Sequence, residues 1–320
     1  MTEWRPGTST EVLHRRAKMM TQIRDFFAHR AVLEVDVPVL AKSTVTDVNI
    51  DSIAASVGLT DSYLQTSPEY FMKRLLASGS GDIYSLGKAF RDAEIGRKHN
   101  PEFTLLEWYR CGWDDHQLMQ EVVDLVALLI AEPNRPPAPT TKLTYSECFT
   151  NVMGFNPHSV DLDQLREIAS QVASGDWSDQ SRANCLDLIF SLRVEPTLPQ
   201  GIVVVHDYPQ CQAALAQISK DSEDDLVSRR FEVFLDGSEI GNGYLELTDP
   251  DEQIARFQTD IIQRNQADRP VVSVDEKFVA SLTHGLPACA GVALGVDRIL
   301  MNISQAKTID QVLTFAWPRC

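Results

Sequence analysis

Apolar residues recur with helical spacing in several parts of the chain. Between Glu11 and Arg30 they fall every three or four positions, which predicts an amphipathic helix. Val32–Pro38 is apolar enough to predict a strand directly after it. The same helical period returns in Gln117–Ala131, Leu162–Ala173 and Ala183–Leu192. The pattern therefore predicts a helix and a strand at the start of the chain and further helices in its middle.

Gly81–Arg110 has the pattern of two strands joined by a polar loop. In the first strand, alternation places Gly87, Ala89 and Arg91 on one face, so small residues leave room beside one cation. The same period in the second strand gives one face the residues Phe103, Leu105, Glu107 and Tyr109. An aromatic surface followed by a carboxylate and a phenol can stack a base and hold an amine. We expect this hairpin to bind a ligand.

A second hairpin is predicted in Arg230–Asp249, because Asp236-Gly237 is typical of a two-residue turn. That turn places Glu239 opposite Phe234, so Glu232 lies diagonally across on the same face. Two carboxylates on one face repel each other unless a cation lies between them. Magnesium, which prefers oxygen ligands, is the natural candidate.

Two glycine-rich segments add further candidates. We expect Gly241–Gly243 to form a β-bulge that turns Glu246 toward a pocket. In the strand before Arg298, Gly291, Ala293 and Gly295 share a face with almost no side chain, on which a flat ligand can lie. Arg298 then begins a helix, where it can bind a phosphate through two nitrogens.

Ser67-Pro68-Glu69 predicts the start of another helix. Ser67 is suited to the N-cap and Pro68 to the first helical position. Glu69 then lies in the first turn, where a carboxylate complements the helix dipole. Glu132–Pro139 is rich in proline and predicts a connecting loop.

These segments together resemble a known family. FRDAE followed by HNPEFT and LEWYR resembles motif 2 of the class II aminoacyl-tRNA synthetases, in the version found in lysine enzymes, and GVALGVDR resembles motif 3. The first helix and Val32–Pro38 resemble motif 1, with Ala31 and Val37 where glycine and threonine are common. The chain is most similar to the lysyl-tRNA synthetase paralogues that activate (R)-β-lysine and attach it to a lysine of elongation factor P. The resemblance covers nearly the whole chain.

The resemblance implies an α+β fold in which an antiparallel sheet is flanked by helices. Because no flexible linker divides the chain into halves, we expect one catalytic domain over residues 1–320, and two helical patterns predict a helical insertion at about 144–199. The resemblance also implies a homodimer, formed through motif 1. ATP and Mg2+ would be the cofactors, and Arg91 and Arg298 the catalytic residues, at the α-phosphate and γ-phosphate respectively.

The resemblance also carries roles for individual residues. ATP contacts are implied for Arg91, Asp92, Ala93, Glu94, His99, Asn100, Phe103, Glu239, Ile240, Gly295 and Arg298. Amino-acid contacts are implied for Ser67, Pro68, Glu69, Glu107, Tyr109, Asn242, Glu246 and Ala293. Metal ligation is implied for Glu232 and Glu239. Since FRDAE has an extra residue relative to the common FRxE pattern, the acidic group that contacts the adenine amine stays open between Asp92 and Glu94.

The net charge and the start of motif 1 bear on which molecule accepts the amino acid. The 320 residues carry a net charge of -16, which disfavours general binding to a polyanion such as tRNA. No anticodon-binding domain precedes motif 1, so we expect elongation factor P rather than tRNA to be the acceptor. A truncated lysyl-tRNA synthetase and a non-catalytic regulator that binds an amino acid or an adenylate are the alternatives. The sequence shows no export signal, no membrane span and no CxxC spacing, so we expect a cytoplasmic enzyme with reduced thiols.

Overall fold

A computed structural model describes residues 4–132 and 136–320. Part of the predicted proline-rich loop, residues 133–135, lies outside the described residues. The chain divides into two compact units. The first comprises Leu247–Cys320, Leu128–Ile130 and the described part of Met1–Asp114; the second comprises Asp115–Ala127 and the described part of Ala131–Glu246. The expectation of one catalytic domain stays a prediction.

The first unit contains a sheet with the strand order β1-β5-β6-β12 and a smaller sheet with the order β2-β4-β3. In the larger sheet β1 runs parallel to β5, and the β5–β6 and β6–β12 pairs are antiparallel. The strands are β1 (Leu33–Glu34), β2 (Leu40–Ala41), β3 (Ala54–Val57), β4 (Thr60–Leu64), β5 (Ile83–Phe90), β6 (Glu102–Cys111) and β12 (Cys289–Gly295).

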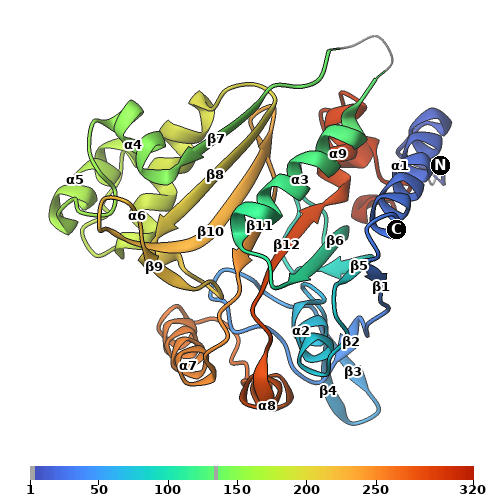
Figure 1. The fold of residues 1–320 in the computed structure, drawn as a ribbon, viewed down its shortest axis with the longest axis horizontal. Coiled ribbons are helices and arrows are strands. Elements are labelled where there is room, and N and C mark those ends of the chain that lie inside the picture. The colour runs from blue at the N-terminus through green and yellow to red at the C-terminus, as the bar shows by residue number, and fades with distance from the viewer. Residues whose placement is uncertain (1–3, 133–135) are drawn as a thin grey trace. The chain divides into compact units, whose positions relative to one another are not determined.

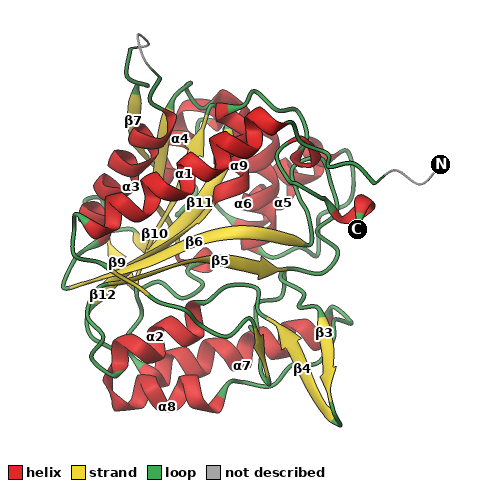
Figure 2. Ribbon diagram, turned by 90° about the vertical axis from the view of Figure 1, so that its right-hand side faces the viewer, coloured by secondary structure: helices red, strands yellow, loops and turns green. Residues whose placement is uncertain are grey.

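Helices cover both faces of the larger sheet of this unit. α2, α7 and α8 lie on one side of β5 and β6, and α1 and α9 lie on the other (Figure 2). The helices are α1 (Thr10–Ala28), α2 (Glu69–Ala77), α7 (Pro250–Gln266), α8 (Glu276–Gly285) and α9 (Val296–Ile303), with short 3-10 turns η4 (Ile309–Gln311) and η5 (Trp317–Arg319). The α1 side is apolar, because Phe27 stacks on Tyr84 at 4.4 Å and meets Trp108 edge to face at 5.3 Å. The aromatic packing fills the α1 side, so a ligand would lie on the side that faces α2, α7 and α8.

The second unit is built on strands in the order β11-β10-β8-β7, with β9 paired to β10 (Figure 1). β8 and β11 are antiparallel to β10, and β7 is parallel to β8. The strands are β7 (Thr140–Thr144), β8 (Ile202–Pro209), β9 (Ile218–Lys220), β10 (Leu226–Leu235) and β11 (Ser238–Leu245). The α3 helix (Asp115–Ile130) contributes residues to both units.

The predicted helical insertion is helical in the structure. It contains α4 (Tyr145–Met153), α5 (Leu162–Ala173), α6 (Arg182–Ile189), a π-helical turn η1 (Phe190–Val194) and the 3-10 turn η2 (Glu195–Thr197), and a further 3-10 turn η3 (Gln210–Gln212) follows β8. These helices bury one core with β8, in which Tyr145 stacks on Phe149 and Phe190. The insertion is thus packed onto the sheet of the second unit through one hydrophobic core.

Most of the predicted elements are confirmed, and three local predictions are wrong. The predicted strand Val32–Pro38 is only two residues long, Leu33–Glu34. Beyond it, Val35 makes one further backbone bond to β5, from its N–H to the Tyr84 carbonyl at 2.8 Å. Pro68 occupies the N-cap position instead of the first helical position, and Ser67 Oγ accepts from the Glu69 N–H at 3.3 Å. The bulge lies at Ile240 instead of Gly241–Gly243.

Candidate functional site

The register of the first unit's sheet brings the predicted residues of β6 and β12, Phe103, Glu107, Tyr109 and Ala293, onto one face. Gly87 pairs with Leu105 and Ala89 with Phe103, as the alternation predicts. On the other side of β6, Ala293 pairs with Glu107. The aromatic and carboxylate residues of β6 are thus flanked by small residues on both neighbouring strands. A flat ligand can lie across this face, toward α2, α7 and α8 (Figure 2).

Arg91 and Phe103 form the aromatic-cationic end of this face. The Arg91 guanidinium lies 5.1 Å from the Phe103 ring centroid. Its Nη1 donates to Glu94 Oε1 at 3.4 Å, whereas its Nε is buried and has no hydrogen-bond partner among the described residues. A buried N–H donor without a partner is costly, so an acceptor on a bound ligand would stabilise it. The geometry fits a phosphate oxygen there.

The loop after Arg91 is held by backbone contacts. Ala93 has a φ of 59°, which is unusual for a residue with a side chain. Asp92 Oδ1 accepts from the Ala93 N–H at 2.8 Å, and the Asp92 N–H donates to the Asp51 carbonyl at 2.8 Å. Asp92 stabilises its own turn, and Glu94 pairs with Arg91. These contacts do not distinguish the two carboxylates, so the choice between them for the adenine amine stays open.

The side chains of His99 and Asn100 make different contacts. Arg298 Nη2 donates to His99 Nε2 at 2.8 Å, so the structure brings together two residues that are remote in sequence. Asn100 is buried, its Nδ2 donates to the Glu102 carbonyl at 2.6 Å and its Oδ1 accepts from the Trp317 N–H at 2.8 Å. Asn100 thus ties the base of the loop to the C-terminal segment.

Arg298 is placed by a residue that sequence reasoning missed. Asp297 is buried, and its carboxylate accepts from Arg16 of α1 at 2.6 Å and from the Thr104 N–H of β6 at 2.7 Å. The only signal in the sequence was its position beside Arg298 in GVDR. Asp297 fixes the first turn of α9 against α1 and β6, and so fixes the backbone that carries Arg298.

Glu107 and Tyr109 form the polar end of the face. Both side chains are buried, and the Tyr109 hydroxyl donates to Glu107 Oε1 at 2.7 Å. The methyl group of Ala293 lies on the strand directly opposite Glu107. A buried carboxylate oriented by a phenol is suited to accept hydrogen bonds from an ammonium group.

Glu69 lies at the first position of α2 and has an unexpected partner. Its Oε1 accepts from Lys73 Nζ at 2.6 Å, and Lys73 is only 1% exposed. The helical spacing of four residues was the only sign of this pair in the sequence. The predicted amino-acid residue is therefore one half of a buried ion pair.

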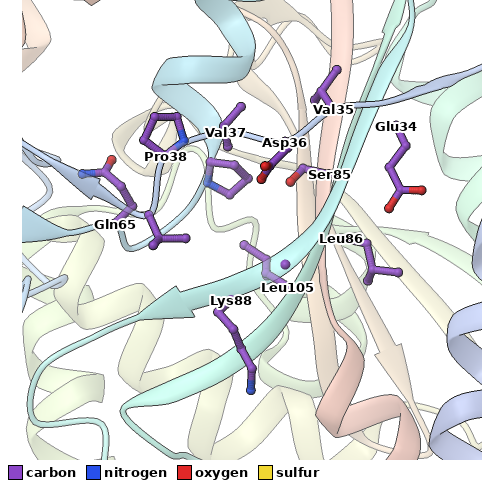
Figure 3. Close-up of a pocket in the computed structure, with 13 residues that line it drawn as sticks. Glu34, Val35, Asp36, Val37, Pro38, Gln65, Ser85, Leu86, Lys88 and Leu105 are labelled. Carbon is purple, nitrogen blue, oxygen red and sulfur yellow. The ribbon is translucent and has the colours of Figure 1, made fainter.

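A cavity of about 300 Å³ lies beside β5 in the first unit (Figure 3). Its lining includes the motif 1 segment Val35–Val39 together with Ser85, Gly87 and Leu105. Pro68, predicted to contact the amino acid, also lines it, as do Gly87 and Leu105 of the predicted ligand-binding hairpin. The cavity therefore adjoins motif 1, and most of the predicted site residues lie elsewhere.

The second unit carries the predicted carboxylate hairpin. Leu235 pairs with Ser238 across the Asp236-Gly237 turn, Phe234 pairs with Glu239, and Glu232 pairs with Asn242. Both turn residues have positive φ, 47° and 73°, as a type I′ turn requires. The predicted register is confirmed. Ile240 has no partner on β10 and its side chain is buried, so only its backbone could contact a ligand.

Glu232 is surrounded by charge. Burial raises its pKa, Arg230 opposes that shift, and the nearby Glu239 carboxylate adds to it. Arg230 Nη2 donates to Glu232 Oε1 at 2.6 Å and its Nη1 to the Gln212 carbonyl at 3.0 Å. Two neighbouring carboxylates, one of which has its pKa raised by the other, are a suitable donor set for a divalent cation.

This donor set is small. Among residues 4–132 and 136–320, no group of three or more His, Cys, Asp or Glu side chains could hold a metal ion. Magnesium keeps several waters and usually takes one or two protein carboxylates together with substrate phosphates. Glu232 and Glu239 therefore fit magnesium bound with a nucleotide, and do not fit a structural metal site.

Glu246 lies just after β11, beyond the glycines that were expected to bulge. It is buried, it forms a bridge with Ala216, and its carbonyl accepts from Gln217 Nε2 at 3.0 Å. The loop that precedes β9 thus holds the backbone of Glu246 in place. The buried bulge residue lies at Ile240, and the register from Gly241 to Tyr244 is regular.

Comparison with known proteins agrees with this geometry. A family profile described as tRNA synthetases class II (D, K and N) matches residues 1–319. The chain therefore belongs to the class II tRNA synthetase family.

Within that family, the chain is similar to proteins curated as elongation factor P-(R)-beta-lysine ligase. It is 42% identical to the one from Vibrio vulnificus over 99% of this chain and 98% of that protein, and 42% identical to the one from Vibrio cholerae over 99% of both. The relative from Pectobacterium carotovorum is 43% identical over 99% of this chain and 98% of its own length. The predicted resemblance and fold class are confirmed.

Proposed function

We propose that the protein is an ATP-dependent ligase that activates (R)-β-lysine as its adenylate and transfers it to a lysine side chain of elongation factor P. The observation that carries this proposal is the sheet register that aligns Phe103, Glu107 and Tyr109 with the small residues of β5 and β12. The names of the similar proteins support the choice of amino acid and acceptor.

In the first step, a carboxylate oxygen of the amino acid attacks the α-phosphorus of ATP, and the bond to pyrophosphate breaks. Arg91, whose buried Nε has no partner among the described residues, would bind the α-phosphate. Arg298 would bind the pyrophosphate side, together with His99, with which it is in contact. Such a reaction needs positioned charges and no nucleophile from the protein.

In the second step, the acceptor amine attacks the carbonyl carbon of the adenylate. The new C–N bond forms the amide, the bond to the phosphate oxygen breaks, and AMP leaves with the electron pair. The attacking amine must be neutral, so its proton leaves before or during the attack.

Recognition of the amino acid is assigned to carboxylates at two places in the first unit. Glu107, oriented by Tyr109, would hold the ammonium of the side chain, and Glu69 would hold the amine near the carboxylate. In the second unit, Glu246 and Asn242 are proposed as amino-acid contacts, and Glu232 and Glu239 as ligands of magnesium. When bound, magnesium would neutralise charge on the phosphates.

The test uses the purified protein with ATP, magnesium and each lysine isomer, and measures exchange of pyrophosphate into ATP. We expect exchange with (R)-β-lysine, and near-complete loss in Glu239→Gln. Exchange that is unchanged in this variant would contradict the metal assignment. No exchange with any lysine isomer would contradict the ligase.

The acceptor is tested separately by mass spectrometry. Elongation factor P should gain the mass of one lysyl group in the presence of the complete system, and tRNA-Lys should not be charged. Charging of tRNA with elongation factor P unmodified would identify a tRNA synthetase instead.

The proposal includes a homodimer in the cytoplasm. Near motif 1, Leu33, Val39 and Leu40 are exposed by 57%, 45% and 39%. Exposed apolar side chains beside the cavity of Figure 3 would be covered by a second copy. In the described part of the chain, no helix is long and apolar enough to cross a membrane.

A further inference from the structure

Lys73 is the least expected charged residue of the first unit. Its side chain is 1% exposed, and lysine is almost never fully buried unless it is paired. It lies on the face of α2 that packs toward α8, where its Nζ is 6.0 Å from the Phe278 ring centroid. Tyr70, one turn earlier on α2, stacks on the same ring at 4.3 Å. The lysine stem thus fills an aromatic interface between two helices.

The position of the ammonium group is set by helix geometry. Side chains of an α-helix point toward its N-terminus, so a residue at i+4 can reach back to the residue at i. Lys73 Nζ therefore meets Glu69 Oε1 at 2.6 Å, at the first position of the helix. Glu69 itself is 16% exposed, so the pair has one buried end and one end that is open to solvent or a ligand.

A methionine of similar length could fill the same space between α2 and α8 without the cost of removing an ammonium group from water. Replacing buried ion pairs by apolar residues is often neutral or stabilising. Packing alone therefore gives no reason for a lysine at position 73. A reason exists if the carboxylate of Glu69 must be held in one orientation.

We propose that Lys73 is a positioning residue of the amino-acid site, whose buried ammonium holds the Glu69 carboxylate so that its exposed side can accept hydrogen bonds from the amine of the substrate. This inference rests on the proposed function, because that function assigns the amine to Glu69. Lys73 itself does not touch the substrate. It also balances the charge of Glu69 when no substrate is bound.

The experiment compares Lys73→Met, Glu69→Gln and the double variant in pyrophosphate exchange with (R)-β-lysine. We expect Lys73→Met to raise the KM for the amino acid by about tenfold or more, while the KM for ATP changes by less than about twofold. In the Glu69→Gln background, Lys73→Met should add little, because Lys73 acts through Glu69. Arg256→Met is the matched control, since Arg256 forms an i,i+4 pair with Glu252 on α7. It should leave both KM values unchanged.

The outcomes separate the positioning role from packing. If Lys73→Met lowers thermal stability but leaves the amino-acid KM unchanged, the lysine is structural and the proposal is wrong. If Lys73→Met does not fold, the double variant is compared with Glu69→Gln, and equal amino-acid KM values support the proposal. A much higher KM in the double variant would overturn it. If the wild-type protein activates no lysine isomer, the proposed function fails, whatever the variants do.

Discussion

The methyl group of Ala293 lies in strand register with Glu107, at the end of the sheet face assigned to the amino acid. The resemblance to lysine tRNA synthetases implies glycine as the usual residue at this point. One methyl group in a tight pocket discriminates by about 1–3 kcal/mol. Such a group would favour an amine displaced by one carbon, as in β-lysine.

We therefore predict that Ala293→Gly improves activation of α-lysine relative to β-lysine. The ratio of kcat/KM for the two isomers, measured by pyrophosphate exchange, is the readout. The control is Ala255→Gly, which removes a methyl group from an exposed position of α7. Ala290 on the same strand as Ala293 is fully buried and would be a poor control. An unchanged ratio in Ala293→Gly would mean that another residue sets the preference.

Asp260 of α7 gives a prediction on pH. Burial raises the pKa of its carboxyl, although a hydrogen bond from Thr46 at 2.8 Å lowers it. The folded state therefore holds this proton to a higher pH than the unfolded chain does. The contribution of Asp260 to the free energy of unfolding is then largest at low pH and falls as the pH rises through its folded pKa.

We expect Asp260→Asn to be more stable than the wild type at neutral pH, with a difference that shrinks as the pH falls. Urea unfolding at a series of pH values measures it. Asp163→Asn is the control, because the Asp163 side chain is 91% exposed. The same difference at all pH values would contradict the assignment.

At the scale of elements, the C-terminal segment braces the loop between β5 and β6. The Trp317 N–H donates to Asn100 Oδ1, and the Ile309 N–H donates to the Arg97 carbonyl at 2.9 Å. These bonds join the loop of motif 2 to a segment that follows motif 3. Weakening them should disturb the residues on both sides of Asn100, which the proposed function assigns to ATP.

Trp317→Pro removes the backbone N–H, whereas Trp317→Ala keeps it. We predict that the proline variant raises the KM for ATP several-fold more than the alanine variant does, with the amino-acid KM unchanged in both. Steady-state kinetics with each substrate varied in turn gives the answer. Equal ATP KM values in the two variants would show that the bond to Asn100 has no influence on the ATP site.

Much of the element pattern could be predicted because it depends on local rules. Period two assigned the faces of β5 and β6, and the Asp236-Gly237 turn fixed the register of β10 and β11. The predicted position of the bulge was wrong. Gly241 and Gly243 permit a bulge, but its position follows from the pairing of Val233 and Phe234 on β10. Glycine allows a bulge but does not locate it.

The predictions missed the groups whose role depends on distant contacts. The burial of Lys73 depends on Phe278, and the position of Asp297 depends on Arg16, each contact bridging residues that are remote in sequence. Arg230 was not predicted to pair with Glu232, because the strand pattern says nothing about rotamers two residues apart. Contacts between charged groups that are remote in sequence leave no periodic signal.

At the scale of the whole molecule, the prediction concerns assembly. If the exposed apolar residues near motif 1 form a dimer interface, Leu33→Asp should shift the protein from twice the mass of the chain toward one chain mass. Light scattering over a range of concentrations measures this. Leu192→Asp is the matched control, because Leu192 is 51% exposed in the second unit. A wild-type protein that is monomeric at all concentrations would contradict the dimer.

The pairing of β6 with β12 has a consequence for synthesis on the ribosome. The two strands are separated along the chain by the whole of the second unit, so β6 leaves the ribosome long before its partner does. Until then β6 exposes one edge with unpaired backbone groups, which is a site for aggregation. Distant pairing also slows folding, since a long loop must close first. Until β12 is synthesised, the nascent chain contains Arg91 but not Arg298. A chaperone that shields the β6 edge during this time would increase the yield of active protein.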